Sequence, residues 1–186
     1  MLYHWIVFSH VVFVIGLCCT LTVEWTALSG MRNTREGAAF QGWSRQLQLI
    51  ERLHPLWAIG IFGSGIYLTS SGWSWNTPFV VIGIAATLIS AALGGALNGP
   101  RFKRLDSAAA ALSASVPAVT NAEANDPVLR LTHGAQTGAT ISIFYLMIVK
   151  PGWAGSVGAV IVGILFGLLV ASRLGVEAAE LAKESR

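Results

Sequence analysis

The sequence predicts an all-α membrane protein, a polytopic bundle of five transmembrane helices with the N-terminus outside and the C-terminus inside. The first observation behind this is five apolar stretches, each close to the about 20 residues that a helix needs to cross a bilayer. They are residues 3–28, 54–71, 78–97, 131–149 and 153–172. The second is composition: with 54% hydrophobic and 11% charged residues, a chain of 186 residues has no room for a separate soluble domain. We therefore expect a single integral membrane domain over residues 1–186.

The third observation is the placement of the twelve Lys and Arg residues, which predicts the orientation. Only Lys150 lies in the connections after the second and fourth stretches. The other eleven share one face if the number of spans is odd: Arg32, Arg35, Arg45, Arg52, Arg101, Lys103, Arg104, Arg130, Arg173, Lys183 and Arg186. The positive-inside bias makes that face cytoplasmic. The N-terminus lacks the positive region of a signal peptide, and the whole pattern is typical of a bacterial cytoplasmic (inner) membrane.

Residues 31–53, before the second stretch, are polar on average but have an apolar period. Phe40, Trp43, Leu47 and Ile50 recur every three or four residues. This spacing predicts an amphipathic helix, either on the inner membrane surface or as a cytoplasmic extension of the second span.

Residues 98–130 form the other predicted inner segment. The run Asn98-Gly99-Pro100 predicts the end of the third span. The Ala-rich residues 101–116 predict a short surface helix. Residues 117–127 contain two Pro and three Asn or Asp residues and predict a mobile loop.

Small residues repeat every four positions along the fifth span: Gly155, Ala159, Gly163, Gly167 and Ala171. Such a stripe lets another backbone approach closely. Packing within the chain is the first interpretation; a membrane protein partner, a homo-oligomer or a cofactor cleft are the alternatives. Lipid is an expected partner and nucleic acid is not, because no basic patch interleaved with aromatic residues lies outside the inner face.

Polar side chains inside the spans are costly and are therefore candidates for function. In the first span, His10 and Glu24 are separated by about 1400° of helical rotation, which returns to within about 40° of the same face. In the fourth span a polar stripe follows helical spacing from His133. Its other members are Gln136, Thr137 and Thr140.

The second and fourth spans run in the same direction, which predicts that His54 and His133 lie at similar depth near the cytoplasmic end, beside Glu24. This inner group is able to bind haem b through two imidazoles, with Arg52 and Arg130 pairing the propionates. It is also able to hold a divalent metal through His54, His133 and Glu24, or to pass protons.

The alternative is that these histidines are interfacial residues without a cofactor. For His54 in particular, the following Pro55 fits the first turn of a helix, which is a purely structural role.

Short motifs over nearly the whole chain resemble a family of predicted bacterial integral membrane proteins, domain of unknown function 2269. They are His10 followed by Gly16, PLWAIGIFGSGIYLTSSGW at 55–73, GPRFKRL at 99–105 and FYLMIVKPGW at 144–153. The arrangement is also loosely similar to the copper-resistance D membrane domain and to the haem-binding protoporphyrinogen oxidase of bacterial haem synthesis. The last resemblance implies that His10 is a haem ligand. The chain departs from that oxidase in its uncharged third span, and from the copper group because it has no outer loop rich in Met or His.

Three functions are compatible with these features. The first is a small haem- or metal-binding membrane protein in a redox or haem-handling role, with His10 or the pair His54 and His133 as ligands. The second is a non-enzymatic accessory or assembly subunit of a membrane complex, which packs through the small-residue stripe. The third is a copper or proton-coupled permease, against which the uncharged third span and the lack of broken helices weigh. None of the three predicts a particular reaction or substrate.

Overall fold

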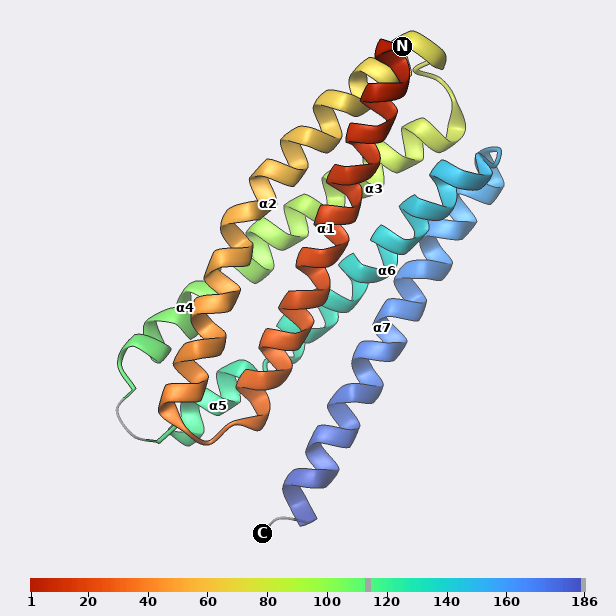
Figure 1. Cartoon of the computed structure of the whole chain (residues 1–186). Coiled ribbons are helices and arrows are strands. Elements are labelled where there is room, and N and C mark those ends of the chain that lie inside the picture. The colour runs from red at the N-terminus through yellow and green to blue at the C-terminus, as the bar shows by residue number, and fades with distance from the viewer. Residues whose placement is uncertain (113–114, 185–186) are drawn as a thin grey trace. The chain divides into compact units, whose positions relative to one another are not determined.

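The computed structural model describes residues 1–112 and 115–184, with side chains undescribed at 118, 119, 121 and 174–184. Within these residues the chain is helical, with one isolated bridge between Glu36 and Ser115 and no strand. The elements in Figure 1 are α1 (Leu2–Asn33), α2 (Gly37–Gly72), α3 (Pro78–Leu93), the π-helix η1 (Gly94–Asn98), α4 (Gly99–Ala110), α5 (Ala118–Ala124), α6 (Pro127–Val149) and α7 (Trp153–Glu184). The predicted all-α class is confirmed.

The chain divides into two compact units, each of which is described by itself. Unit 1 comprises Met1–Thr77 and Arg104–Ala124, and unit 2 comprises Pro78–Lys103 and Asn125–Arg186. The single membrane domain over residues 1–186 stays a prediction.

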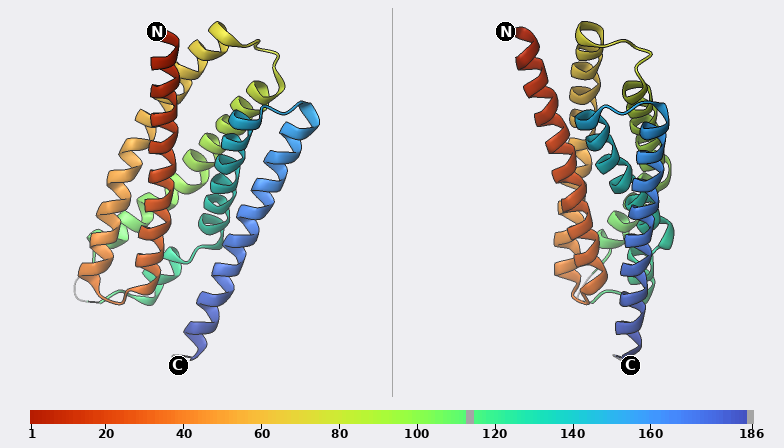
Figure 2. Two further views of the ribbon diagram at one scale, coloured as in Figure 1. Left: turned by 45° about the vertical axis from the view of Figure 1, so that its right-hand side comes forward. Right: turned by 90° about the vertical axis from the view of Figure 1, so that its right-hand side faces the viewer.

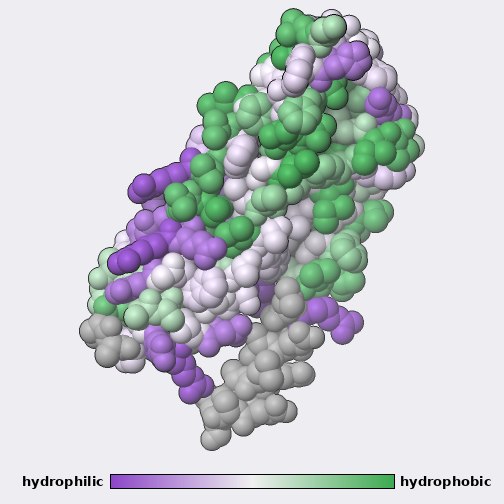
Figure 3. Space-filling view, in the orientation of Figure 1, coloured by the Kyte–Doolittle hydropathy of each residue, from purple (hydrophilic) through white to green (hydrophobic). Residues whose placement is uncertain are grey.

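Three of the described helices are long and apolar enough to cross a membrane: Leu2–Asn33, Pro78–Ala110 and Trp153–Arg173. On α1, Phe8 and Ile15 are exposed, and on α7 Val162 and Leu165 are exposed. Figure 3 shows hydrophobic side chains (green) gathered where α1 begins and hydrophilic ones (purple) towards the opposite end of α1 and α2. Exposed apolar surface of this kind is typical of a protein that contacts lipid.

Unit 1 is built on an antiparallel hairpin of α1 and α2, which lie side by side along their length (Figure 2). The amphipathic segment expected at 31–53 is not a separate surface helix, because α2 runs without a break from Gly37 to Gly72. Its buried residues Phe40 and Leu47 have the predicted period. This result favours the interpretation in which the segment extends the second span.

Pro55 lies inside α2, so the prediction that it occupies the first turn of a helix is wrong. A proline in a helix interior removes one backbone hydrogen bond and usually bends the helix. The helix continues because α1 packs on both sides of the proline: the Trp43 ring lies against Gly30, and the Trp57 ring lies against Gly16. Contacts with α1 thus keep the helix intact at Pro55, where the sequence by itself favours a break.

Aromatic rings seated on glycines set the register of the hairpin. An ideal Cβ at Gly16 would lie 2.8 Å from two ring carbons of Trp57. In the opposite direction, Phe13 of α1 covers Gly60 of α2. Because each ring fills the space where a side chain would be, sliding the helices by one turn would create clashes as well as gaps.

Unit 2 contains the second hairpin, α6 and α7, joined by residues 150–152, with Lys150 in the left-handed conformation (φ 53°). Backbones approach where glycines face one another: a Cβ at Gly134 would lie 2.6 Å from the carbonyl oxygen of Gly167, and a Cβ at Gly163 would lie 2.6 Å from that of Gly138. The prediction that Gly163 and Gly167 contact another helix backbone is confirmed. A second copy of the chain would contact these two glycines only by displacing α6. The homo-oligomer alternative therefore requires another face of α7.

Two sequence expectations about the segment after the third span are wrong. The helix does not end at Asn98-Gly99-Pro100, because η1 carries it into α4, with the Gly99 N–H bonded to the Gly94 carbonyl. A π segment is one way in which a helix accommodates a break in its hydrogen-bond ladder. The expected loop at 117–127 also contains helix α5, and α6 begins at Pro127 rather than at 131.

Candidate functional site

The polar residues of the α1–α2 hairpin gather at two levels. The outer level contains His10 of α1 and Ser64 of α2, and the inner level contains Glu24 of α1 and His54 of α2. Ten residues of α1 separate His10 from Thr20, which contacts His54. Ten residues of helix rise by about 15 Å. One iron or metal ion is therefore unable to bind both His10 and His54.

At the outer level, the His10 ring contacts the Ser64 side chain and the Ile61 backbone of α2. Its Nδ1 lies 2.8 Å from the Ser64 hydroxyl, and that hydroxyl donates its proton to the Gly60 carbonyl of its own helix. The Ser64 hydroxyl is thus able to bond both the His10 ring and the backbone of its own helix, which orients the imidazole. Nothing in the sequence singles out Ser64 for this role except its hydroxyl group.

At the inner level, the structure brings Glu24 and His54 together as the sequence analysis expected. Nδ1 of His54 lies 3.3 Å from Oε1 of Glu24, whose side chain is only 3% exposed. Nε2 of His54 lies 3.4 Å from the Thr20 hydroxyl, which donates to the Leu17 carbonyl at 2.7 Å. The His54 ring thus lies between Thr20 and Glu24, with one ring nitrogen facing each of them.

The remaining members of the predicted inner group are not gathered with this pair within either unit. Arg52 is exposed on α2. His133, with 0% exposure, and the partly buried Arg130 belong to α6 in unit 2. It therefore stays a prediction that His54 faces His133. The same holds for the pairing of Arg52 and Arg130 with haem propionates.

The polar stripe of α6 takes part in a network inside unit 2. The Gln136 amide donates to the Ser90 carbonyl at 2.8 Å and accepts from the Asn98 amide at 2.7 Å. Thr132 donates to the side-chain oxygen of Asn98. The hydroxyl of Thr140 instead donates to a carbonyl of its own helix. The network gives Gln136 a structural role.

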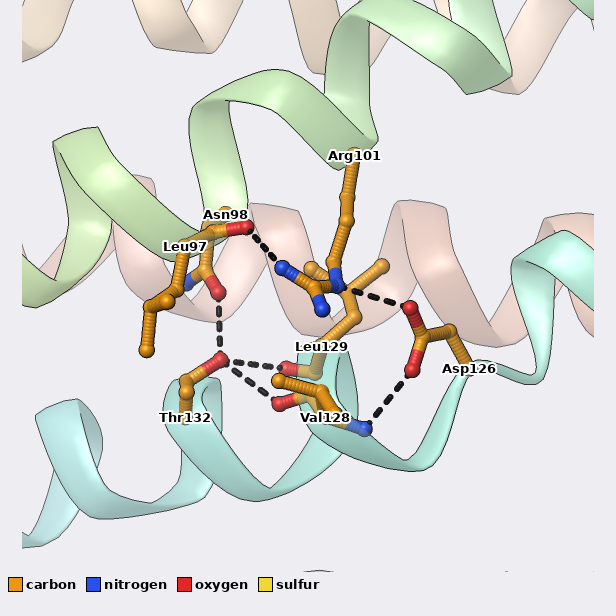
Figure 4. A network of polar contacts seen from close by, with 7 residues as sticks. All are labelled: Leu97, Asn98, Arg101, Asp126, Val128, Leu129 and Thr132. Atoms are coloured by element: carbon orange, nitrogen blue, oxygen red, sulfur yellow. Dashed lines mark hydrogen bonds and ion pairs between the residues drawn. The ribbon is translucent and has the colours of Figure 1, made fainter.

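An ion pair adjoins this network in Figure 4. Nε of Arg101 lies 2.7 Å from Oδ2 of Asp126, and Arg101 also donates to the Leu97 carbonyl at 2.7 Å. The other carboxylate oxygen of Asp126 accepts from the Val128 N–H at 2.8 Å and so caps α6. This pair was not predicted, because Arg101 was expected in a surface helix and Asp126 in a mobile loop.

Partial burial acts to raise the pKa of Asp126, but the hydrogen bonds from Arg101 and Val128 outweigh it and hold the pKa below its ordinary value. A depressed folded-state pKa contributes stability that is present above the ordinary carboxyl pKa of about 4 and is lost as pH falls through the folded-state pKa. Asn is also a good N-cap residue. We therefore expect Asp126→Asn to lower the free energy of unfolding near pH 7 by up to about 1 kcal/mol, chiefly through the ion pair.

Thermal unfolding in detergent, recorded from pH 7 down to pH 3, checks this expectation. The difference between the two proteins should shrink below pH 4. In an Arg101→Gln background the Asp126 substitution should have little further effect. A difference that is independent of pH would contradict the assignment.

No group of three or more His, Cys, Asp or Glu side chains within residues 1–112 and 115–184 is already gathered for a metal ion. Glu24 and His54 supply two potential ligands, whereas catalytic zinc sites usually have three from the protein. The predicted metal set of Glu24, His54 and His133 is thus assembled only in part within unit 1.

Comparison with protein-family models, with curated proteins and with solved structures finds no match for the chain. The family resemblances inferred from short motifs stay predictions.

Proposed function

We propose that this chain is a small multi-pass membrane protein that binds haem b through His10, in a redox or haem-handling role. The observation that carries the proposal is the contact between His10 Nδ1 and the Ser64 hydroxyl. Histidines that ligate a metal almost always donate the other ring N–H to a polar partner, which sets the orientation of the ring and increases its basicity. The Ser64 hydroxyl is in the position of such a partner, 2.8 Å from Nδ1, and haem iron would then bind at Nε2.

The surroundings of His10 suit this role. The ring lies part-buried between α1 and α2, in a predicted span where a polar side chain is costly without a function. When bound, haem b would supply one-electron chemistry. His10 would hold the iron on one side, and Ser64 would orient the imidazole.

A visible spectrum of the purified chain, loaded with haem, tests the proposal. We expect a Soret band with sharp reduced α and β bands, and we expect His10→Ala to lose them. His4→Ala is the matched control, because His4 is exposed on the same helix. Ser64→Ala should keep the haem but raise its midpoint potential, because a less basic imidazole stabilises ferric iron less well. A wild-type protein without a Soret band, or a His10→Ala protein with an unchanged one, would exclude this function.

We also propose the five-span topology in a bacterial inner membrane, with the N-terminus outside. It is supported by the eleven positive charges that share one predicted face, against Lys150 alone on the other. A membrane-impermeant thiol reagent checks it on a Cys18→Ala, Cys19→Ala background. Reagent added from outside should label Ser74→Cys, in the connection after α2, and not Ser107→Cys in α4. The reverse pattern would refute the orientation, and labelling of both sites would refute the number of spans.

A further inference from the structure

We propose that a pocket between α2 and α4 binds the headgroup of a phospholipid that carries both a phosphate and a primary ammonium group, as phosphatidylethanolamine does. The pocket lies within unit 1 and has a volume of about 290 Å³. This volume is at the lower end of the range for small-molecule sites, about 300–1,000 Å³, and it suits one headgroup better than a large cofactor. The proposal goes beyond haem binding at His10 and does not depend on it.

Each wall of the pocket is one face of a helix. The residues that line it on α2 lie three, four and seven positions after the first, and residues at this spacing share a helix face. They are Gln41, Ser44, Arg45 and Gln48, and they face Asp106 and Ala110 of α4. The Gln41 amide donates to the carbonyl groups of Ala109 and Leu112, at 3.1 and 3.0 Å. These hydrogen bonds hold the end of α4 against α2 and keep the two walls together.

The pocket is lined by one positive and one negative side chain, Arg45 and Asp106, which are not joined by an ion pair. Oδ1 of Asp106 accepts hydrogen bonds from Ser44 and Gln48, which hold the carboxylate in place. Within the part of the chain that the structure describes, no group donates to Oδ2 of Asp106, and Arg45 has no hydrogen bond. A ligand with one negative and one positive group is therefore able to pair with both side chains at once.

The chemistry of the lining favours ethanolamine over other headgroups. The planar guanidinium group of Arg45 is suited to bind a phosphate through two hydrogen bonds. A primary ammonium group is able to donate a hydrogen bond to Asp106, whereas a quaternary ammonium group has no N–H. Quaternary groups such as choline are instead recognised by aromatic side chains, and the described lining residues include none. A headgroup without an amine would leave the Asp106 charge unpaired beside the phosphate.

The level of the pocket favours a lipid as the source of the headgroup. Leu49 is the first exposed large apolar side chain along α2, and it lies four residues, or about 6 Å, from Arg45. Hydrophilic side chains gather towards this end of α1 and α2 (Figure 3). The headgroup region on each side of the hydrocarbon core is about 5–8 Å thick. A lipid whose acyl chains pack on the apolar surface that begins at Leu49 would therefore place its headgroup at the level of Arg45.

Short-chain lipids that differ only in the headgroup test the proposal. The full chain, purified in detergent, is titrated with dihexanoyl phosphatidylethanolamine, with its choline and glycerol analogues and with free phosphoethanolamine, and binding is measured from the shift in thermal unfolding. We expect the ethanolamine lipid to bind about 10–100-fold more tightly than the other two lipids, because it alone gives Asp106 a charged hydrogen-bond donor. Equal binding of the three lipids would overturn the proposal. Tighter binding of free phosphoethanolamine than of the ethanolamine lipid would overturn the lipid as the source.

Two near-isosteric or charge-removing variants locate the site. Asp106→Asn keeps an oxygen that accepts from Gln48 but removes the charge, and it should abolish the preference for the ethanolamine lipid. Arg45→Gln should weaken binding of that lipid by about tenfold or more, because it removes the partner of the phosphate. Arg35→Gln and Glu36→Gln, at exposed positions outside the pocket, are the matched controls and should bind as the wild type does.

A third variant, Ala110→Leu, keeps both charges and fills the pocket, so that it should prevent binding of the headgroup. Far-UV circular dichroism identifies variants that fail to fold. A folded Asp106→Asn protein that still prefers the ethanolamine lipid, or a folded Ala110→Leu protein that binds it as tightly as the wild type, would refute the site. His10→Ala keeps this proposal apart from the haem proposal, because it should lose the Soret band and retain the lipid preference.

Discussion

Replacing Gly163 by leucine should lower the free energy of unfolding by about 1–3 kcal/mol, through overpacking between α6 and α7. The β-carbon alone would lie 2.6 Å from the Gly138 carbonyl oxygen and would also collide with the Ser142 hydroxyl. That hydroxyl donates to the Ala159 carbonyl at 2.8 Å, so moving it would break a contact between the two helices. Neither neighbour is the end of a long flexible side chain, and the helices would have to separate.

Thermal unfolding in detergent measures the effect, and Gly158→Leu is the matched control. Gly158 lies five residues earlier on α7, and a Cβ there would meet nothing within 4 Å. Leucine is the better helix former by about 0.8–1 kcal/mol, so that the control should be neutral or stabilised. Equal behaviour of the two variants would show that α6 does not pack on this face of α7.

Gln136→Leu should have the second large effect, a loss of about 1–3 kcal/mol. It removes the acceptor of the Asn98 amide and leaves that group, in a side chain only 3% exposed, without this partner. An unsatisfied buried donor is costly, whereas removing both partners of a hydrogen bond is much less so. We therefore expect Asn98→Leu with Gln136→Leu to destabilise the protein by less than the sum of the two single changes.

A double-mutant cycle by denaturant or thermal unfolding provides this comparison. Thr140→Val serves as the control on α6, because its hydroxyl donates only to the Gln136 carbonyl of the same helix. It should change the stability by no more than about 0.5 kcal/mol. Strict additivity of the two larger changes would mean that Asn98 and Gln136 do not depend on one another.

Several elements of the fold could be predicted because their signals are repeated many times along the chain. Helices α1 and α7 follow from long apolar runs, and the contacts of Gly163 and Gly167 follow from small residues every fourth position. The errors fall where a prediction rested on a short local signal. Pro55 and the run Asn98-Gly99-Pro100 are local signals for a helix end, yet packing against α1 continues the helix past Pro55 and a π segment continues it past Pro100.

The residues of the candidate site also divide into those that the sequence could predict and those that it could not. The histidines and Glu24 stand out in the sequence because polar groups are rare in apolar stretches. Their partners do not stand out: Ser64 and Thr20 are small and common in membrane helices. They acquire a role only because the hairpin places Ser64 opposite His10 and Thr20 beside His54.

The sequence by itself determined the all-α class, the apolar helices and the residues able to carry chemistry, because burial preference and helical period are properties of each segment alone. Only the tertiary structure decided where the helices end, which glycines touch and which side chains face each hairpin histidine. These depend on atoms far apart in the chain: the Ser64 hydroxyl 54 residues from His10, the Thr20 hydroxyl 34 residues from His54. No local pattern encodes such a distance, because it is set by how ring-on-glycine contacts align α1 with α2.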